Sequence, residues 1–225
     1  MRKVLFNKLS AVDGTTESSF DADDVTDLSK YFPRLDGCRW NYVVSAKPHK
    51  AATSDEVTSQ ADRLVLTTIR SNSDLIITTG KTAVAEQLNG SSYAPMMVLT
   101  NNSKIDFPAL QTPSKHQILL TIETGRFQNS KVSCLGSTSG ELTNWLRNHT
   151  GDYPSKVFEG GIDTGTDLVN AGFIDQICLS VTSSENFTES LDAAHEFLSR
   201  TSRNFKATQV LECENTWFFT FQVNG

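Results

Sequence analysis

The sequence predicts an α/β fold in which helices flank a central, mostly parallel mixed sheet, with antiparallel strands near the C-terminus. Short, continuous apolar runs at 74–79 and 117–122 have the composition of strands that are buried on both faces. Segments with helical spacing of apolar residues alternate with such runs, which favours parallel pairing. The last two predicted strands, at 207–212 and 217–223, suit an antiparallel edge of the sheet.

The predicted elements follow in a regular order. The first convincing strand, at 39–45, is rich in aromatic and β-branched residues and is followed by Pro48. Possible capping boxes, Thr53-x-x-Glu56 and Thr138-x-x-Glu141, indicate the starts of helices at about 55–71 and 142–149. The other predicted elements are short helices at 82–88 and 167–171, strands at 96–100, 156–159 and 176–181, and a helix near 188–199.

One main domain accounts for most of the chain, which has 225 residues. Residues 1–36 are polar and acidic, so we expect an N-terminal arm or a short helix that lies over the main domain, residues 37–225. The acidic run within 21–27 is typical of a solvated charged surface.

Composition excludes several classes of function. The formal net charge of −6 gives no basic field that would attract a nucleic acid. The four cysteines are far apart and the four histidines lack metal-ligand spacing, so we predict buried thiols and no metal site. The N-terminal apolar stretch is too short for a signal peptide and no run is long enough to span a membrane, which predicts a cytoplasmic protein.

Two glycine-containing loops follow predicted strands. At Gly160-Gly161 the lack of Cβ atoms would let backbone N–H groups approach a phosphate, although the spacing alone favours a tight strand-to-helix turn. The segment Thr79-Gly80-Lys81-Thr82 is a second possible phosphate or ribose loop. Neither GxGxxG nor the P-loop pattern occurs. Glu159, beside the glycines, could position a proton or a substrate amine, or it could simply be solvated.

Several segments occur in an order that resembles the pyrimidine reductases of riboflavin biosynthesis. The segments are Val43–Ala46, Ala61–Arg70, Asp74–Thr82 with Ala85-Glu86, and Phe158–Gly161 with Gly172–Asp175. The resemblance implies a dihydrofolate-reductase-like fold, NADPH as the cofactor, and reduction of the ribosyl group of a phosphorylated aminopyrimidine. The family commonly forms dimers, so it also implies a homodimer that acts on a small-molecule substrate.

The resemblance also implies roles for particular residues. Glu159 would be catalytic, and the substrate would lie near Ser45, Arg63 and Glu86. Residues that would contact the cofactor are Ala46, Thr79, Gly80, Thr82, Thr100, Asn101, Lys104, Gly160, Gly161, Ile162 and Thr164.

Three departures from the family pattern keep a second hypothesis open. The chain lacks the usual Asp-Gly after Ser45, has Lys81 in the usual Gly-x-Gly-Thr turn, and offers no arginine for a substrate phosphate in 85–89. The alternative is therefore a nucleotide-binding or regulatory relative that has the same fold and no turnover. Retention of Glu159-Gly160-Gly161 favours the reductase.

Overall fold

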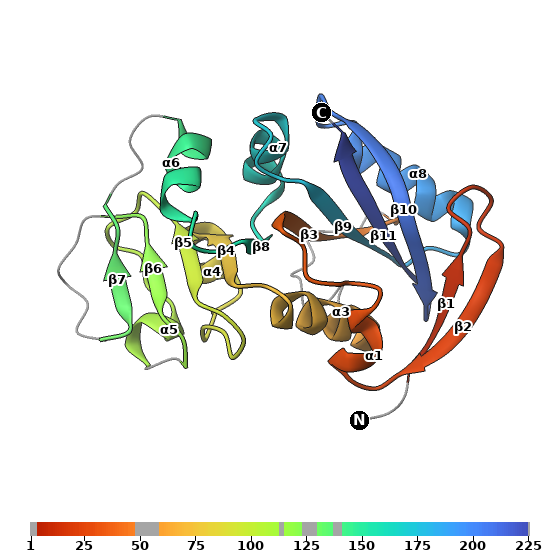
Figure 1. The fold of residues 1–225 in the computed structure, drawn as a ribbon, viewed down its shortest axis with the longest axis horizontal. Helices are drawn as coiled ribbons and strands as arrows, with labels where there is room; N and C mark the ends of the chain where they lie inside the picture. Colours follow the sequence, from red (N-terminus) through yellow and green to blue (C-terminus); the bar gives the residue numbers. More distant parts are fainter. Residues whose placement is uncertain (1–3, 48–58, 113–114, 123–129, 137–140, 225) are drawn as a thin grey trace.

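The computed structural model describes residues 4–47, 59–112, 115–122, 130–136 and 141–224 (Figure 1). Its described strands form one eleven-stranded sheet, in the order β2-β1-β10-β11-β9-β3-β8-β4-β5-β6-β7. Their bounds are β1 Val4–Leu9, β2 Thr16–Ala22, β3 Gly37–Ser45, β4 Leu75–Thr79, β5 Met96–Leu99, β6 Ile118–Leu120, β7 Val132–Cys134, β8 Ser155–Phe158, β9 Gln176–Thr182, β10 Asn204–Cys213 and β11 Thr216–Asn224.

The sheet has a parallel part and an antiparallel part. All pairings from β9 through β3, β8, β4, β5 and β6 to β7 are parallel. Those among β9, β11, β10, β1 and β2 are antiparallel. This arrangement confirms the predicted fold class, including the antiparallel pair near the C-terminus.

Helices cover both faces of the sheet. They are α1 Val25–Ser29, α3 Gln60–Ser71, α4 Gly80–Ala85, α5 Pro108–Gln111, α6 Leu142–His149, α7 Ile162–Asn170 and α8 Phe187–Leu198. Buried residues of α1, α3, α4 and α5 belong to one apolar cluster, and those of α6, α7 and α8 belong to another. The sheet therefore separates two cores. No helix in the described ranges is long and apolar enough to cross a membrane.

Helix α3 has the apolar stripe that the sequence predicted, but its described part begins at Gln60. The Ser59 hydroxyl caps it by accepting a hydrogen bond of 3.1 Å from the Asp62 N–H. The predicted capping box Thr53-x-x-Glu56 lies outside the described residues, as does Thr138 of the second one. Glu141 is instead the N-cap of α6, without a capping side-chain bond.

The N-terminal segment, expected as an arm or a short helix, contributes two strands of the main sheet. β1 pairs with β10, and β2 pairs with β1 at the sheet edge (Figure 1). Phe6 is fully buried between Phe20 and Phe218, at centroid distances of 5.5 and 5.8 Å. The short helix α1 follows, capped by the Asp24 carboxylate. Packing of the Phe6 side chain joins the N-terminal segment to the apolar core that includes the buried residues of α3.

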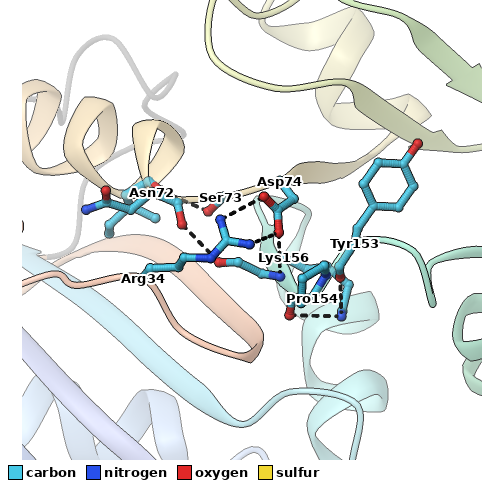
Figure 2. A network of polar contacts seen from close by, with 9 residues as sticks. Arg34, Asn72, Ser73, Asp74, Tyr153, Pro154 and Lys156 are labelled. Carbon is cyan, nitrogen blue, oxygen red and sulfur yellow. Dashed lines mark hydrogen bonds and ion pairs between the residues drawn. The ribbon is translucent and has the colours of Figure 1, made fainter.

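A polar network joins three chain segments at the amino ends of β4 and β8 (Figure 2). Both guanidinium NH₂ groups of Arg34 donate to the Asp74 carboxylate, one of them over 2.7 Å. The Ser155 N–H donates to the same carboxylate over 3.0 Å, and its hydroxyl donates to the Asn72 carbonyl over 2.9 Å. The hydrogen bond from Arg34 lowers the pKa of Asp74. This network holds the start of β8 beside β4, and so sets their relative register.

Three of the four cysteines are buried as predicted, whereas Cys134 is exposed. The prediction of a buried thiol is wrong for Cys134 because it ends β7, the strand at one edge of the described sheet. Burial raises the pKa of Cys213 to about 12 and also raises the pKa values of Cys38 and Cys178. The buried thiols therefore remain protonated at neutral pH.

Candidate functional site

Four loops at one edge of the sheet form the candidate site. β3, β8, β4 and β5 are neighbours and parallel, so the segments that follow them leave the same edge. β4 leads into α4 on one face, whereas the adjacent β8 leads into α7 on the other face. Adjacent strands whose connections leave to opposite faces open a crevice between them, and ligands of open α/β sheets bind there.

The turn from β4 to α4 brings together several of the predicted cofactor residues. Thr79 is the N-cap of α4, and its hydroxyl lies 3.2 Å from the Thr82 N–H and 2.9 Å from the Thr82 hydroxyl. A Cβ at Gly80 would lie 2.7 Å from the Thr100 hydroxyl oxygen and 2.8 Å from Ile105 Cδ1. A glycine is therefore required at position 80, because the loop after β5 approaches the turn closely.

The turn from β8 to α7 uses two glycines for different reasons. A Cβ at Gly160 would overlap the buried ring of Phe158 and lie 2.8 Å from Thr79 Cγ2, so this glycine lets the turn pack on that ring and against the end of β4. A Cβ at Gly161 would meet nothing within 4 Å. Gly161 is also the N-cap of the nine-residue helix α7 and provides no side-chain cap. The first N–H groups of α7 thus face an open approach, which is the arrangement that suits a phosphate. Thr164 lies half-buried in this first turn.

The loop after β5 is ordered by side-chain caps. The Thr100 N–H donates to the Thr121 hydroxyl over 2.8 Å, and the Asn102 N–H donates to the Thr100 hydroxyl over 3.1 Å. The Lys104 N–H donates to the Asn102 side-chain oxygen over 2.9 Å. The side chains of Asn101 and Lys104 are exposed. Lys104 therefore offers a positive charge at the outer end of the candidate site.

Glu159 is held by an ion pair that the sequence analysis did not identify. Arg70, in the last turn of α3, donates from Nε to Glu159 Oε1 over 2.9 Å and from Nη2 to Oε2 over 2.6 Å. The Glu159 and Arg70 side chains are 11% and 23% exposed, and the Glu159 charge raises the pKa of Arg70. The Glu159 N–H also donates to the Ile77 carbonyl over 2.8 Å. Both carboxylate oxygens accept hydrogen bonds from Arg70, so Glu159 connects the turn after β8 to the end of α3.

The three predicted substrate residues lie on three different elements, β3, α3 and α4. Ser45 ends β3, and its buried hydroxyl has no hydrogen-bond partner among the described residues. Arg63 is exposed in the first turn of α3. Glu86 is exposed at the C-cap of α4, where its charge reaches Arg70 and contributes to the raised pKa of the guanidinium.

Asp62 is a buried acid that the sequence analysis missed. It is 6% exposed in the first turn of α3, and its carboxyl is hydrogen-bonded to Ser180 of β9. Burial is the main cause that raises its pKa. Its position three residues before Val65 and seven before Ile69 places it on the apolar stripe of α3, and this spacing was the available signal. A buried acid of raised pKa is a candidate functional group.

A cavity of ≈ 590 Å³ lies at the carboxyl end of β3, on the face of the sheet that α7 and α8 cover. It lies between the end of β3, the first residue of α7, and α8. Among its lining residues are Ser45, Ala46 and Ile162, which the sequence analysis assigned to substrate and cofactor. The other lining residues are Val44 of β3 and residues from the start of α8, its face and its C-terminal continuation, which the sequence analysis did not connect with a site.

Within the described part of the chain, the carboxylates of Asp23, Asp24 and Asp27 lie within 4.8 Å of one another. Asp24 accepts from the Thr26 and Asp27 N–H groups, and Asp27 accepts from the Asp23 N–H over 3.0 Å. These bonds explain the cluster as the cap of α1, remote from the four loops.

Comparison with known proteins identifies the fold. No family model matches the chain, and no curated protein matches it by sequence. Among solved structures, RibD from Acinetobacter baumannii superposes with a TM-score of 0.61 at 14% identity, covering 88% of this chain and 61% of RibD. A pyrimidine reductase-like protein from Corynebacterium diphtheriae gives a TM-score of 0.63 at 13% identity, covering 88% and 95% of the two chains.

The riboflavin biosynthesis reductase Rib7 of Saccharomyces cerevisiae gives a TM-score of 0.56 at 11% identity, covering 88% of this chain and 98% of Rib7. The chain spans about three fifths of the RibD chain that it matches. These likenesses confirm the dihydrofolate-reductase-like fold that the resemblance implied.

Proposed function

We propose that this chain, which shares the fold of the riboflavin-type pyrimidine reductases, is an NADPH-dependent reductase of a phosphorylated ribosylaminopyrimidine or a related small molecule. The observation that carries the proposal is the open backbone at Gly161, at the uncapped start of α7 and beside the turn from β4 to α4. That pair of turns at a crevice between parallel strands is suited to a dinucleotide.

The residues present fit the cofactor. Gly161, Ile162 and Thr164 would hold the pyrophosphate and the nicotinamide end at the start of α7, with Gly160 keeping the backbone close to Thr79. Residues that would contact the ribose, the 2′-phosphate and the remaining surface of the cofactor are Ala46, Thr79, Gly80, Thr82, Thr100, Asn101 and Lys104.

The bound cofactor would supply the hydride, and the chain would supply placement. The Arg70–Glu159 pair fixes the turn that contacts the cofactor. Glu159 as a catalytic group stays a prediction, since its contact with a substrate would require the carboxylate to share or leave Arg70. Ser45, Arg63 and Glu86 would face the substrate.

A binding test with a matched control examines the cofactor site. A methyl group at Gly161 meets no atom of the protein, so Gly161→Ala should fold normally and weaken NADPH binding about tenfold by blocking the backbone approach. At Gly151→Ala the added Cβ would lie 3.7 Å from the Arg147 carbonyl oxygen, and affinity should not change. Titrations of NADPH and NADH, followed by tryptophan fluorescence, measure both. Equal affinity in all three proteins, or no saturable binding, would contradict the proposal.

A second candidate function is nucleotide binding without turnover. The engagement of both Glu159 oxygens by Arg70 favours it, since this carboxylate is not free to move a proton. The test is consumption of NADPH when the ribosylaminopyrimidine phosphate is supplied. A protein that binds NADPH and does not consume it, with wild type and Glu159→Gln alike, fits the alternative. A rate that Glu159→Gln lowers without unfolding the protein fits the reductase.

We further propose a cytoplasmic homodimer, because proteins of the resembled family commonly pair. Sedimentation equilibrium of the purified chain tests the dimer, and a single species of 24.8 kDa would contradict it.

A further inference from the structure

The cavity beside α8 has a lining that the proposed reductase function does not explain. Its volume of ≈ 590 Å³ lies within the range of small-molecule sites. Apolar side chains line one part of it, namely Val44, Ala46, Ile162, Ala193 and Phe197. Polar and charged groups from the start and the face of α8 line the other part.

The sequence of α8 creates this mixed lining. Thr188, Asp192, Glu196 and Arg200 recur at a spacing of four residues, which places them along one line on the helix and its C-terminal continuation. Phe197 anchors the helix from the adjacent line, because its ring stacks on Tyr42 of β3 at a centroid distance of 5.2 Å. The helix is thus fixed over the sheet while its charged line borders the cavity.

The charge of the lining is negative. Three carboxylates, those of Glu189, Asp192 and Glu196, border the cavity together with one guanidinium, that of Arg200. Glu189 is occupied, since it accepts from the Glu185 N–H over 2.7 Å and from the Ser184 hydroxyl over 3.3 Å. The carboxylates of Asp192 and Glu196 have no hydrogen bond or ion pair with the described residues, and both residues are exposed.

A second group in the lining also lacks a partner. The Ser45 hydroxyl is buried and makes no hydrogen bond with any residue in the described ranges. Buried hydroxyl groups are normally hydrogen-bonded, so the unpaired hydroxyl of a residue that lines the cavity indicates a polar partner outside the described residues. This hydroxyl lies at the end of β3, next to Ala46.

We propose that this cavity is a binding site for a small organic cation, an amine or an amidine attached to an apolar body. Its charged group would face Asp192 and Glu196, and its apolar body would lie against Val44, Ala46 and Ile162. An anionic ligand such as a sugar phosphate is disfavoured by the same carboxylates. Ala46 and Ile162 are the expected nicotinamide contacts. The idea that the bound cation is also the molecule reduced therefore rests on the proposed function, whereas binding of the cation does not.

Three probes of nearly identical shape test the proposal on the full chain. Benzamidinium, benzamide and benzoate differ mainly in charge, so their affinities separate charge recognition from apolar contact. Chemical shifts of backbone amides in the ¹⁵N-labelled protein report both affinity and location. We expect saturable shifts at Ala46, Ile162 and Ala193, and about fivefold tighter binding of benzamidinium than of benzamide, since two exposed carboxylates act together.

Asp192→Asn with Glu196→Gln should abolish the preference for benzamidinium and leave benzamide binding unchanged. Asp167→Asn is the matched control, because it removes an exposed carboxylate of α7 that does not border the cavity. Equal affinity for all three probes, shifts at another surface, or a preference that survives the double substitution would overturn the proposal. Titration of the same samples with NADPH separates the two proposals. If the wild-type protein binds benzamidinium but not NADPH, only the reductase proposal is refuted.

Discussion

The ion pair of Arg70 and Glu159 joins the end of α3 to the glycine turn, and both side chains are largely buried. Removing one member of such a buried pair leaves the other charge unpaired, so Arg70→Met or Glu159→Gln alone should lower the free energy of unfolding by about 2–3 kcal/mol. The double variant should recover most of this loss, because no unpaired charge remains. Urea denaturation at pH 7 measures all four corners of the cycle. Additive losses in the double variant would show that the two side chains do not interact.

Asp62 makes a prediction about pH, because its pKa is raised in the folded protein by burial. Between the unfolded and the folded pKa values, the folded chain binds more protons, so the cost of ionising Asp62 grows as pH rises and is fully present above the folded pKa. Asp62→Asn removes this cost and can still bond to Ser180. We expect its melting temperature to exceed that of the wild type at pH 7–8, with the difference shrinking toward pH 4. A difference that is constant with pH would contradict this assignment.

Among the elements, the inner strands were predictable and the outer ones were not. β4 and β6 are continuous apolar runs, since both faces of the sheet are covered there. β1 has its alternation broken by an irregularity between Lys8 and Leu9, and β2 exposes most of its side chains at the sheet edge. β7 has three residues, none of them buried. β1 and β2 therefore lack both the continuous apolar run and the clean alternation that predict a strand, and β7 is too short to show either pattern.

The next prediction concerns Gly165 of α7, which lies against the indole of Trp40. A Cβ there would overlap the ring. Trp40 is fully buried and packs on Phe158 and Phe197, so it cannot move aside. Gly165→Ala should therefore lower stability by about 1–2 kcal/mol, even though alanine favours a helix by about 1 kcal/mol. Gly151→Ala, where the added Cβ would make only an ordinary contact of 3.7 Å with the Arg147 carbonyl oxygen, serves as the control. Chemical denaturation followed by circular dichroism measures both, and equal midpoints would refute the overlap.

For the whole molecule, the sequence predicted the glycine turns that follow β4 and β8 but not the side chains that hold or surround them. Glycines at strand ends mark Gly80 and Gly160, because close backbone approach leaves a local trace in the sequence. Arg70 pairs with a residue 89 positions away, and the cavity forms only when α8 folds over β3. Neither feature therefore leaves a local pattern in the sequence. The same dependence on distant contacts made the first 36 residues resemble an arm.

That segment gives the last prediction, which concerns cooperativity of the whole sheet. Phe6 is fully buried, whereas the neighbouring Leu5 is 55% exposed on the same strand. If β1 belongs to the folding unit, Phe6→Ala should cost about 3–4 kcal/mol and Leu5→Ala within about 0.5 kcal/mol. Trp217 in β11, Trp40 in β3 and Trp145 in α6 should all report one shifted midpoint, as single-tryptophan variants would show. An independent arm would instead leave the midpoint at Trp145 unchanged by Phe6→Ala, because its melting would not reach the far end of the sheet.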